Sequence, residues 1–476
     1  MHLKISQKLL ALIVINQLAS PVIAQDGSKN VDPVSDEQAG KAMLSLTHVE
    51  PDLTPFSDYS GEFFNRATLT GDWGGSRTNL YEQGVTFDAL LTQVYQNVAS
   101  GGVDSGNDDT YTGLLDYGMT FDTGKLGLWS GGLLTFNAQT GFASNDPLGS
   151  GNLSPTNFTG IYPTADKPDT VLMEHYLTQA LSKELGVVVG RINAVNFLDK
   201  NRYADNPRNQ FMNLAMNNSP LLGSMVSFST YAVLASWQVS ENITINPAIY
   251  DPNLQPGDSS PKGKGLFSDI GYGVEVAVSW KLSDEYDGAL RVDGLYNNKD
   301  TTLLDNPRLP EDILLGISPE TKSSNWLVNV NFEQAVWKPA GAGTKNTRRK
   351  TQALPQLRTS AYDFEEPGIG VFGRVAYGPD DRHAWDFYVM GGVSGRGIFA
   401  GRPYDRIGVG FYYMKEGDDL NDQPGNLLQD ETGYEVFYNL AITPSVQLTF
   451  DVQWVDSGIT GNDDATVVGM RLMTPF

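Results

Sequence analysis

Residues 446–455 read VQLTFDVQWV, with apolar and polar residues in alternation. Every second position is apolar: Val446, Leu448, Phe450, Val452 and Trp454. The positions between them carry glutamine, threonine and aspartate. Successive side chains of a β-strand point to opposite faces, so this segment is predicted to be a strand with one apolar and one polar face.

Segments of the same kind recur to the end of the chain, separated by clusters of Gly, Asn, Asp and Pro. The predicted strands are residues 86–97, 111–122, 132–142, 173–182, 186–192, 223–237, 242–250, 270–281, 287–298, 324–337, 368–377, 383–394, 404–414, 432–441, 446–455 and 465–474. Sixteen is an even number, which suits a closed antiparallel barrel whose two ends lie on one side.

A soluble sandwich would show similar stripes, with its polar face in water. Two features favour a membrane. Aromatic residues stand near the ends of apolar stripes, where interface girdles belong: Trp280, Tyr296, Trp326 and Trp454. The chain also ends in a strand with a terminal aromatic residue, Phe476. The predicted fold class is therefore all-β, a sixteen-stranded antiparallel transmembrane β-barrel of the outer membrane.

Loop lengths agree with this topology when the N-terminus is placed on the periplasmic side. The outward connections 143–172, 193–222, 251–269, 299–323 and 415–431 are long, and the inward connections 183–185, 238–241, 282–286 and 442–445 are short. Long outer loops and short periplasmic turns are typical of outer-membrane barrels. The basic connection 338–367 breaks this pattern, either as a periplasmic insertion or because the strand count slips there.

The N-terminal region has two parts. Residues 1–24 combine Lys4 and Lys8, an apolar run and a small-residue site ending at Ala24, which is typical of a cleaved signal peptide for secretion across the inner membrane. Residues 25–66 are rich in Asp, Ser, Pro and Gln and are predicted to be a flexible lead-in. The barrel, with a short N-terminal helix, occupies 67–476.

Composition excludes several function classes. The 476 residues include 33 Lys and Arg against 56 Asp and Glu, which disfavours a nucleic-acid partner. There is no cysteine and only four histidines, so we expect no cofactor and no metal. The Asp clusters at 104–109 and 456–464 could bind Ca²⁺ through oxygens, but they fit solvated turns better. The dispersed positions of His48, His175 and His383 argue against an enzyme.

Residues 68–102, TLTGDWGGSRTNLYEQGVTFDALLTQVYQNVASGG, resemble the opening of the carbohydrate-selective porin OprB family. That opening has a Gly-Asp-Trp-Gly-Gly element, a short Arg-Thr-x-Leu helix and a first strand ending in Ser-Gly-Gly. Shorter matches follow at 174–179, 189–191, 371–374, 401–405, 434–443 and 468–471. The resemblance implies a sixteen-stranded barrel that passes sugars passively; residues 25–66 and 338–367 depart from it.

The opening motif also has a local interpretation. Ser76 is predicted to cap a helix over 77–83 that Gly84 ends, with Leu80 and Tyr81 packing it against the barrel. This role is structural, and it is preferred here to direct contact with a sugar.

Strand parity and the long loop 193–222 give the candidate pore-lining residues. Parity alone selects Arg291, Asp293, Glu333, Glu435 and Arg471; parity with the resemblance adds Glu174, Arg191, Arg374 and Arg406; the loop adds Arg202, Arg208 and Asn209. Such side chains offer the donors and acceptors that sugar hydroxyls need. Any one of them could instead wet the lumen or pair across strands.

The loop itself either folds inward as the constriction or covers the outer surface. We expect a porin for passive, carbohydrate-selective diffusion of small sugars into the periplasm, and a channel not selective for sugars is the alternative. The expected partners are small sugars, the lipid bilayer and lipopolysaccharide, in a monomer or a homotrimer.

Overall fold

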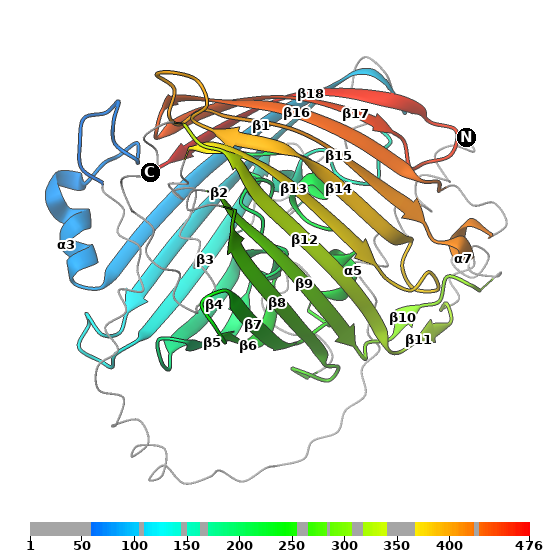
Figure 1. The fold of residues 1–476 in the computed structure, drawn as a ribbon, viewed down its shortest axis with the longest axis horizontal. Helices are drawn as coiled ribbons and strands as arrows, with labels where there is room; N and C mark the ends of the chain where they lie inside the picture. Colours follow the sequence, from blue (N-terminus) through cyan, green and yellow to red (C-terminus); the bar gives the residue numbers. More distant parts are fainter. Residues whose placement is uncertain are drawn as a thin grey trace, which may run out of the picture.

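Sixteen antiparallel strands close into one barrel in the computed structural model, and β1 pairs with β18 to complete it (Figure 1). The structure describes residues 59–103, 109–143, 150–161, 170–254, 265–282, 286–306, 318–339, 367–422 and 428–476. Each predicted strand has its counterpart, so the sixteen-stranded prediction is confirmed. The predicted signal peptide, most of the lead-in and most of connection 338–367 lie outside the described residues.

The strands follow the chain order around the barrel, with each strand hydrogen-bonded to its neighbours. They are β1 (Val85–Gly102), β2 (Asp109–Asp122), β3 (Gly132–Ala143), β4 (Thr170–Ala180), β5 (Leu185–Ile192), β6 (Thr230–Gln238), β7 (Ile243–Tyr250), β8 (Gly271–Lys281), β9 (Asp287–Asn297), β12 (Asn325–Trp337), β13 (Gly368–Tyr377), β14 (Trp385–Arg396), β15 (Arg406–Glu416), β16 (Glu431–Thr443), β17 (Val446–Asp456) and β18 (Asp463–Pro475). A small hairpin of β10 (Thr301–Thr302) and β11 (Thr321–Lys322) stands outside the barrel sheet, in a long connection.

The described helices are short and lie in connections. They are α3 (Ser76–Glu82), α4 (Leu214–Asn217), α5 (Leu222–Met225) and α7 (Asp418–Asn421), with 3-10 turns at Trp73–Gly75, Phe158–Gly160 and Ala194–Asn196. Among the described residues, no helix has the length and apolar composition needed to cross a bilayer.

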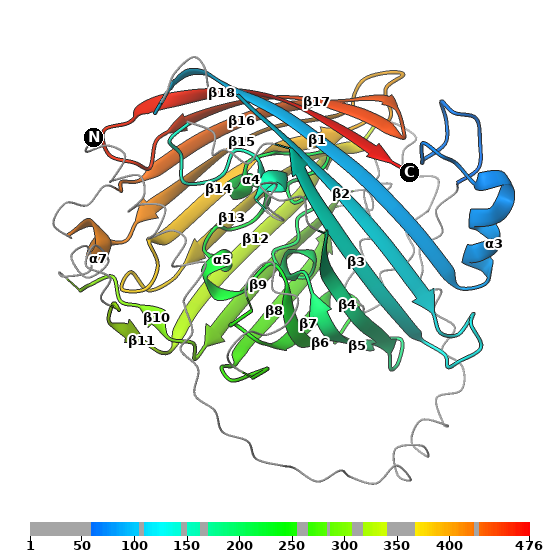
Figure 2. The same cartoon turned by 180° about the vertical axis from the view of Figure 1, so that it is seen from behind.

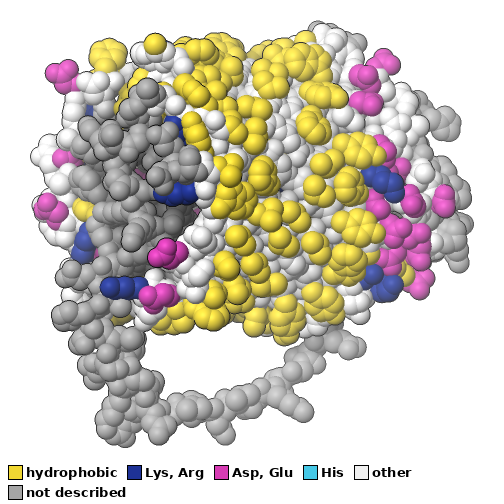
Figure 3. All heavy atoms as spheres, in the orientation of Figure 1, with side chains coloured by type: hydrophobic (Ala, Val, Ile, Leu, Met, Phe, Trp, Pro, Cys, Tyr) yellow, Lys and Arg dark blue, Asp and Glu magenta, His cyan; other side chains and the backbone are white. Residues whose placement is uncertain are grey.

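The alternation of side chains separates the outside of the barrel from its interior. In β17, Phe450 and Trp454 are 44% and 46% exposed, whereas Asp451 and Gln453 are 2% and 1% exposed. Figure 3 shows the resulting apolar surface as a broad yellow band over the strands, with acidic side chains gathered at one end. An apolar outer band is what a barrel surrounded by lipid requires.

Helix α3 lies at one end of the barrel, beside the C-terminus and the start of β1 (Figure 2). The short turns 123–131 and 181–184 are at this end, which we call the inner end; the opposite end, with α7 and the β10–β11 hairpin, is the outer end. As predicted, Gly84 follows α3 with a φ of 91°. The predicted Ser76 cap is wrong, because Ser76 is already the first helical residue. Asp72 accepts the backbone N–H of Thr78 at 2.8 Å instead.

Arg77 of α3 joins the N-terminal segment to both strands of the barrel seam. Its side chain is buried and donates to the main-chain oxygens of Phe87 at 2.7 Å and Phe476 at 2.9 Å. It also lies 3.4 Å from the Asp88 carboxylate and stacks over the ring of Tyr59, 3.9 Å from its centroid. One guanidinium therefore satisfies acceptors at the place where the first and last strands meet.

Replacing Arg77 by Met should destabilise the barrel by about 3 kcal/mol or more, because it strands a buried carboxylate and two carbonyl oxygens. The midpoint of urea unfolding in phospholipid vesicles, followed by tryptophan fluorescence, measures this. Lys183→Ala, in the exposed turn after β4, is the control and should leave the midpoint unchanged. An unchanged midpoint in Arg77→Met would show that the seam closes without this side chain.

Candidate functional site

The connection between β5 and β6, residues 193–229, lies inside the barrel (Figure 2). Its helices α4 and α5 are seen through the open end, surrounded by the strands. Phe211, Met216 and Asn217 are fully buried. Of the two alternatives for 193–222, the structure shows the inward one, and we call residues 193–229 the inward loop.

The inward loop is fixed to β13 by a buried ion pair. Arg374 Nε donates to Asp199 Oδ1 at 2.8 Å, and neither side chain has any exposed surface. Arg374 Nη2 reaches the carbonyl oxygens of Asp199 and Ala204. The amides of Asn329 and Asn331 on β12 donate to the same Asp199 oxygen at 3.1 and 2.8 Å. Since the carboxylate is paired and hydrogen-bonded, its burial is tolerated.

A second set of contacts lies on β16 and β18. Glu435 accepts the backbone N–H groups of Met212 and Asn213, the latter at 3.1 Å. Arg471 donates to the carbonyl oxygens of Pro207 at 2.9 Å and Gln210 at 2.5 Å. Charged wall residues thus satisfy the backbone of a loop that has no sheet partner of its own.

The lumen on the side of β13–β16 is closed by apolar packing. Phe211 of the inward loop lies between Phe372 and Phe437, with ring centroids 5.6 and 4.8 Å away. Met216 belongs to the same buried cluster. Tyr388 donates its hydroxyl to the carbonyl oxygen of Ala215 in α4.

Glycines on the wall make room for this packing. A Cβ at Gly410 of β15 would lie 2.1 Å from Met216 Cε. A Cβ at Gly370 of β13 would lie 2.0 Å from the ring of Tyr203. Any other residue at these two positions would force the side chain of Met216 or Tyr203 to shift.

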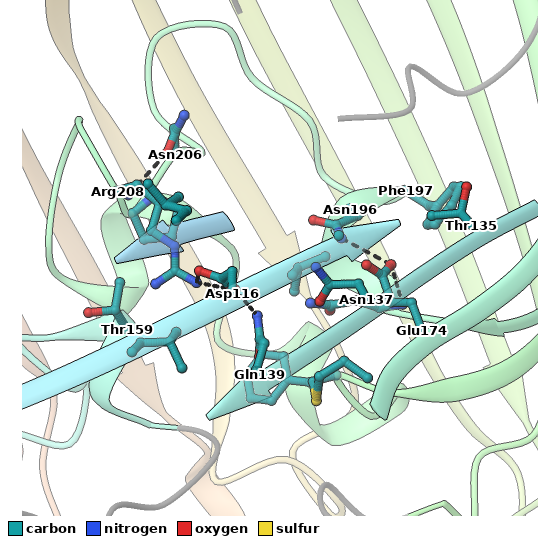
Figure 4. Close-up of a pocket in the computed structure, with 18 of the residues that line it drawn as sticks. Asp116, Thr135, Asn137, Gln139, Thr159, Glu174, Asn196, Phe197, Asn206 and Arg208 are labelled. Atoms are coloured by element: carbon teal, nitrogen blue, oxygen red, sulfur yellow. Dashed lines mark hydrogen bonds and ion pairs between the residues drawn. The ribbon is translucent and has the colours of Figure 1, made fainter. Parts of the chain in front are cut away.

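A cavity of about 210 Å³ remains between the inward loop and the wall formed by β1–β4. Figure 4 shows its polar centre, where Arg208 of the loop faces Asp116 of β2, with Nη2 3.0 Å from Oδ2. Asp116 also accepts from Gln139 Nε2 at 2.6 Å. Glu174 of β4 accepts from Asn196 of the loop at 3.1 Å.

Apolar rings complete the cavity. Phe158, Phe197, Phe228 and Tyr176 are among its lining residues. Four polar atoms of the lining residues are buried without a hydrogen-bond partner among the described residues: Arg208 Nη1, Asn193 Oδ1, Thr135 Oγ1 and Asp116 Oδ2, of which Asp116 Oδ2 is in the ion pair with Arg208. The cavity lining therefore combines hydrogen-bonding side chains with flat apolar faces.

The structure brings only some of the predicted site residues to this cavity. Glu174 and Arg208 line it. Arg202 and Arg291 meet at Glu333 on β12, which accepts the Arg202 backbone N–H at 2.6 Å and Arg291 Nη2 at 3.3 Å.

The remaining predicted residues are buried elsewhere. Arg191, Arg374, Arg471 and Glu435 are at most 1% exposed. Arg191 donates to Ser229 Oγ at 2.6 Å, and the other three hold the inward loop. Asp293 accepts from Asn329 Nδ2 at 2.8 Å; Asn209 is buried in the loop, and Arg406 is 7% exposed at the inner end of β15. Parity identifies the face of a strand correctly, but not what covers that face.

Some lining residues were missed by the sequence prediction: Asp116, Asn137, Gln139, Lys200 and Asp205. For Asp116 a signal exists, because the even-numbered positions of 111–122 share the lumen face. Lys200 and Asp205 lie in the loop, where no periodicity indicates direction.

Known proteins share this architecture. The family model described as "Carbohydrate-selective porin, OprB family" matches residues 106–476. The chain belongs to the OprB family of carbohydrate-selective porins. Its fold and family are those of outer-membrane channels, and the resemblance inferred from residues 68–102 is confirmed.

Two kinds of relative agree with this assignment. Porin B of Pseudomonas aeruginosa is 22% identical over 448 residues, which cover 87% of this chain and 92% of that protein. The high-pH structure of Pseudomonas putida OprB has a TM-score of 0.69 at 19% identity, covering 87% of this chain and 100% of that one. The low-pH structure of the same protein has a TM-score of 0.51 at 16% identity. The porin thus shares its fold with both structures.

Replacing Arg374 by Met should release the inward loop and raise the single-channel conductance. The change leaves Asp199 buried without its partner, which costs about 3–5 kcal/mol. Trypsin cleavage in 193–229 should become faster. The double variant Asp199→Asn, Arg374→Met should be more stable than Arg374→Met alone, because it removes both buried charges. Unchanged conductance in the single variant would show that other contacts suffice.

His383, in the outer connection 378–384, contacts the inward loop and predicts a pH dependence. Its Nδ1 is 2.9 Å from Ser224 Oγ in α5, and its Nε2 is 2.9 Å from Asn325 Oδ1. Burial lowers the pKa of His383 to about 4, from 6.5. Between pH 4 and pH 6.5, His383 is therefore protonated in the unfolded chain but neutral in the folded chain. The free energy of unfolding accordingly decreases as the pH falls from about 6.5 to 4.

The free energy of unfolding at pH 4 should be lower than at pH 7 by on the order of 3 kcal/mol because of His383. Unfolding midpoints measured from pH 7 to pH 4 should drop less steeply in His383→Gln than in the native porin. Parallel profiles for the two proteins would contradict this assignment.

Proposed function

We propose that small sugars diffuse passively through the cavity between the inward loop and β1–β4. The observation that carries this proposal is the composition of the cavity lining. Arg208 Nη1 and Asn193 Oδ1 are unpaired, and Phe158 and Phe197 supply apolar surface beside them. A pyranose ring has a polar rim and apolar faces, and binding sites match ligands by a few placed polar groups in an apolar surround.

The predicted site residues then have two different roles. Glu174 and Arg208 contact the sugar directly. Arg191, Arg374, Arg471 and Glu435 position the inward loop that narrows the route. The contacts that support this division are buried hydrogen bonds to the loop backbone and to Ser229.

Further parts of the proposed function rest on the sequence. We propose that the porin acts without enzymatic chemistry and without a cofactor. Residues 1–24 serve as a signal peptide cleaved after Ala24, and the mature barrel is a monomer or a homotrimer in a membrane with lipopolysaccharide. Mass spectrometry of the purified protein tests the cleavage site.

Replacing Arg208 by Ala should weaken the block of ion current by glucose roughly three- to tenfold, because a hydrogen bond to the sugar is lost. Measurement in a planar bilayer gives the half-blocking concentration. The control is Arg402→Ala, which removes the same charge from the turn 397–405 at the inner end. If Arg208→Ala keeps the half-blocking glucose concentration of the native porin, the sugar passes elsewhere in the barrel.

The porin should prefer small cations to anions. Among the described lining residues, the acids are Asp88, Asp116, Glu174 and Asp205, and the bases are Lys200 and Arg208. A narrow route with low-dielectric walls strengthens the effect of such an excess. Reversal potentials in a salt gradient measure the preference; a preference for anions would mean that the arginines dominate the route.

A further inference from the structure

The charges in the cavity are not evenly compensated. Three of its carboxylates have a basic partner: Asp88 lies 3.4 Å from Arg77, Asp116 lies 3.0 Å from Arg208, and Asp205 lies 3.2 Å from Lys200. Within the part of the chain that the structure describes, Glu174 has no ion-pair partner.

Glu174 is held with one oxygen engaged and the other open. Glu174 is only 6% exposed. Oε1 accepts the Asn193 backbone N–H at 3.0 Å and the Asn196 amide at 3.1 Å. Oε2 accepts no hydrogen bond from the described residues, and Glu174 lines the cavity (Figure 4). The two donors fix the orientation of the carboxyl group and leave Oε2 for a ligand.

Aromatic rings stand beside this carboxyl group. Tyr176 lies two residues along β4 from Glu174 and also lines the cavity. Its ring packs edge-on against Phe197 of the inward loop, with centroids 5.6 Å apart. Aromatic faces attract cations, so the rings and the carboxylate favour the same kind of ligand.

We propose that the cavity binds protonated amino sugars more strongly than neutral hexoses of the same size, with Glu174 Oε2 as the acceptor for the ammonium group. This inference rests on the proposed passage of sugars through the cavity. An ammonium offers three donors and a positive charge where a hydroxyl offers one donor. Its charge also favours the ionised form of the carboxyl group beside it. Sugar acids bring a second negative charge to the same place and bind least.

Ion-current block by glucose, glucosamine and glucuronate at pH 6 tests the proposal. The half-blocking concentration of glucosamine should be roughly five- to tenfold below that of glucose, because charge-assisted hydrogen bonds are about twice as strong as neutral ones. Glucuronate should block least. Glu174→Gln keeps the shape of the side chain and should make glucosamine and glucose equivalent. Glu241→Gln, in the exposed turn between β6 and β7, should preserve the difference.

A measurement on the native porin makes the test independent of folding of the variant. Raising the pH to 9 deprotonates the sugar amine, whose pKa is about 8 by analogy with α-amino groups, and should abolish the preference. Equal block by glucose and glucosamine at pH 6 would overturn the inference and leave the proposed function intact. Absence of block and of liposome swelling with every sugar would instead overturn the proposed function.

Discussion

Sixteen strands enclose more space than their own side chains can fill, and this constraint governs the rest of the structure. An unfilled barrel of this size is a wide aqueous channel with little discrimination. The inward loop, residues 193–229, answers the constraint by occupying the lumen. Because such a loop brings unpaired backbone groups into the interior, the wall must supply donors and acceptors for it. Arg374, Arg471 and Glu435 do so from three different strands.

Buried charges are costly unless they are paired and hydrogen-bonded, and the porin uses them where position matters most. Asp199 and Arg374 have no exposed side-chain surface, and each makes additional hydrogen bonds. An apolar contact of similar area would allow the loop to slide along the wall. Directional hydrogen bonds allow one register, so the cavity keeps one shape.

The sequence predicts the barrel well because alternation is a local property. Each strand shows its two faces within about ten residues, and Phe450 and Asp451 lie on the predicted sides of β17. The site is predicted less well, because the inward loop covers wall residues that are far from it in the sequence. The sequence places both Arg191 and Glu174 on the interior side of the barrel. In the structure Arg191 is buried against Ser229, whereas Glu174 lines the cavity. Which of them the loop covers depends on contacts between residues far apart in the chain, and no period of the sequence records these.

Part of the segment 338–367 and the lead-in before residue 59 lie outside the described residues, so predictions for them stay predictions.

The position of the cavity follows from a difference between two sides of the same wall. The inward positions of β13–β16 carry large side chains such as Phe372, Tyr388 and Phe437, and the loop packs against them. The cavity wall on β2 and β3 instead carries smaller or polar residues, such as Thr120 and Asn137. Apolar burial therefore draws the loop toward one side, because each buried aromatic or methionine side chain contributes about 1.5–3 kcal/mol. The space left over on the other side is lined by hydroxyl, amide and charged groups together with aromatic rings. The polar part of the cavity lining thus depends on where the apolar residues are, since they decide which wall the loop leaves open.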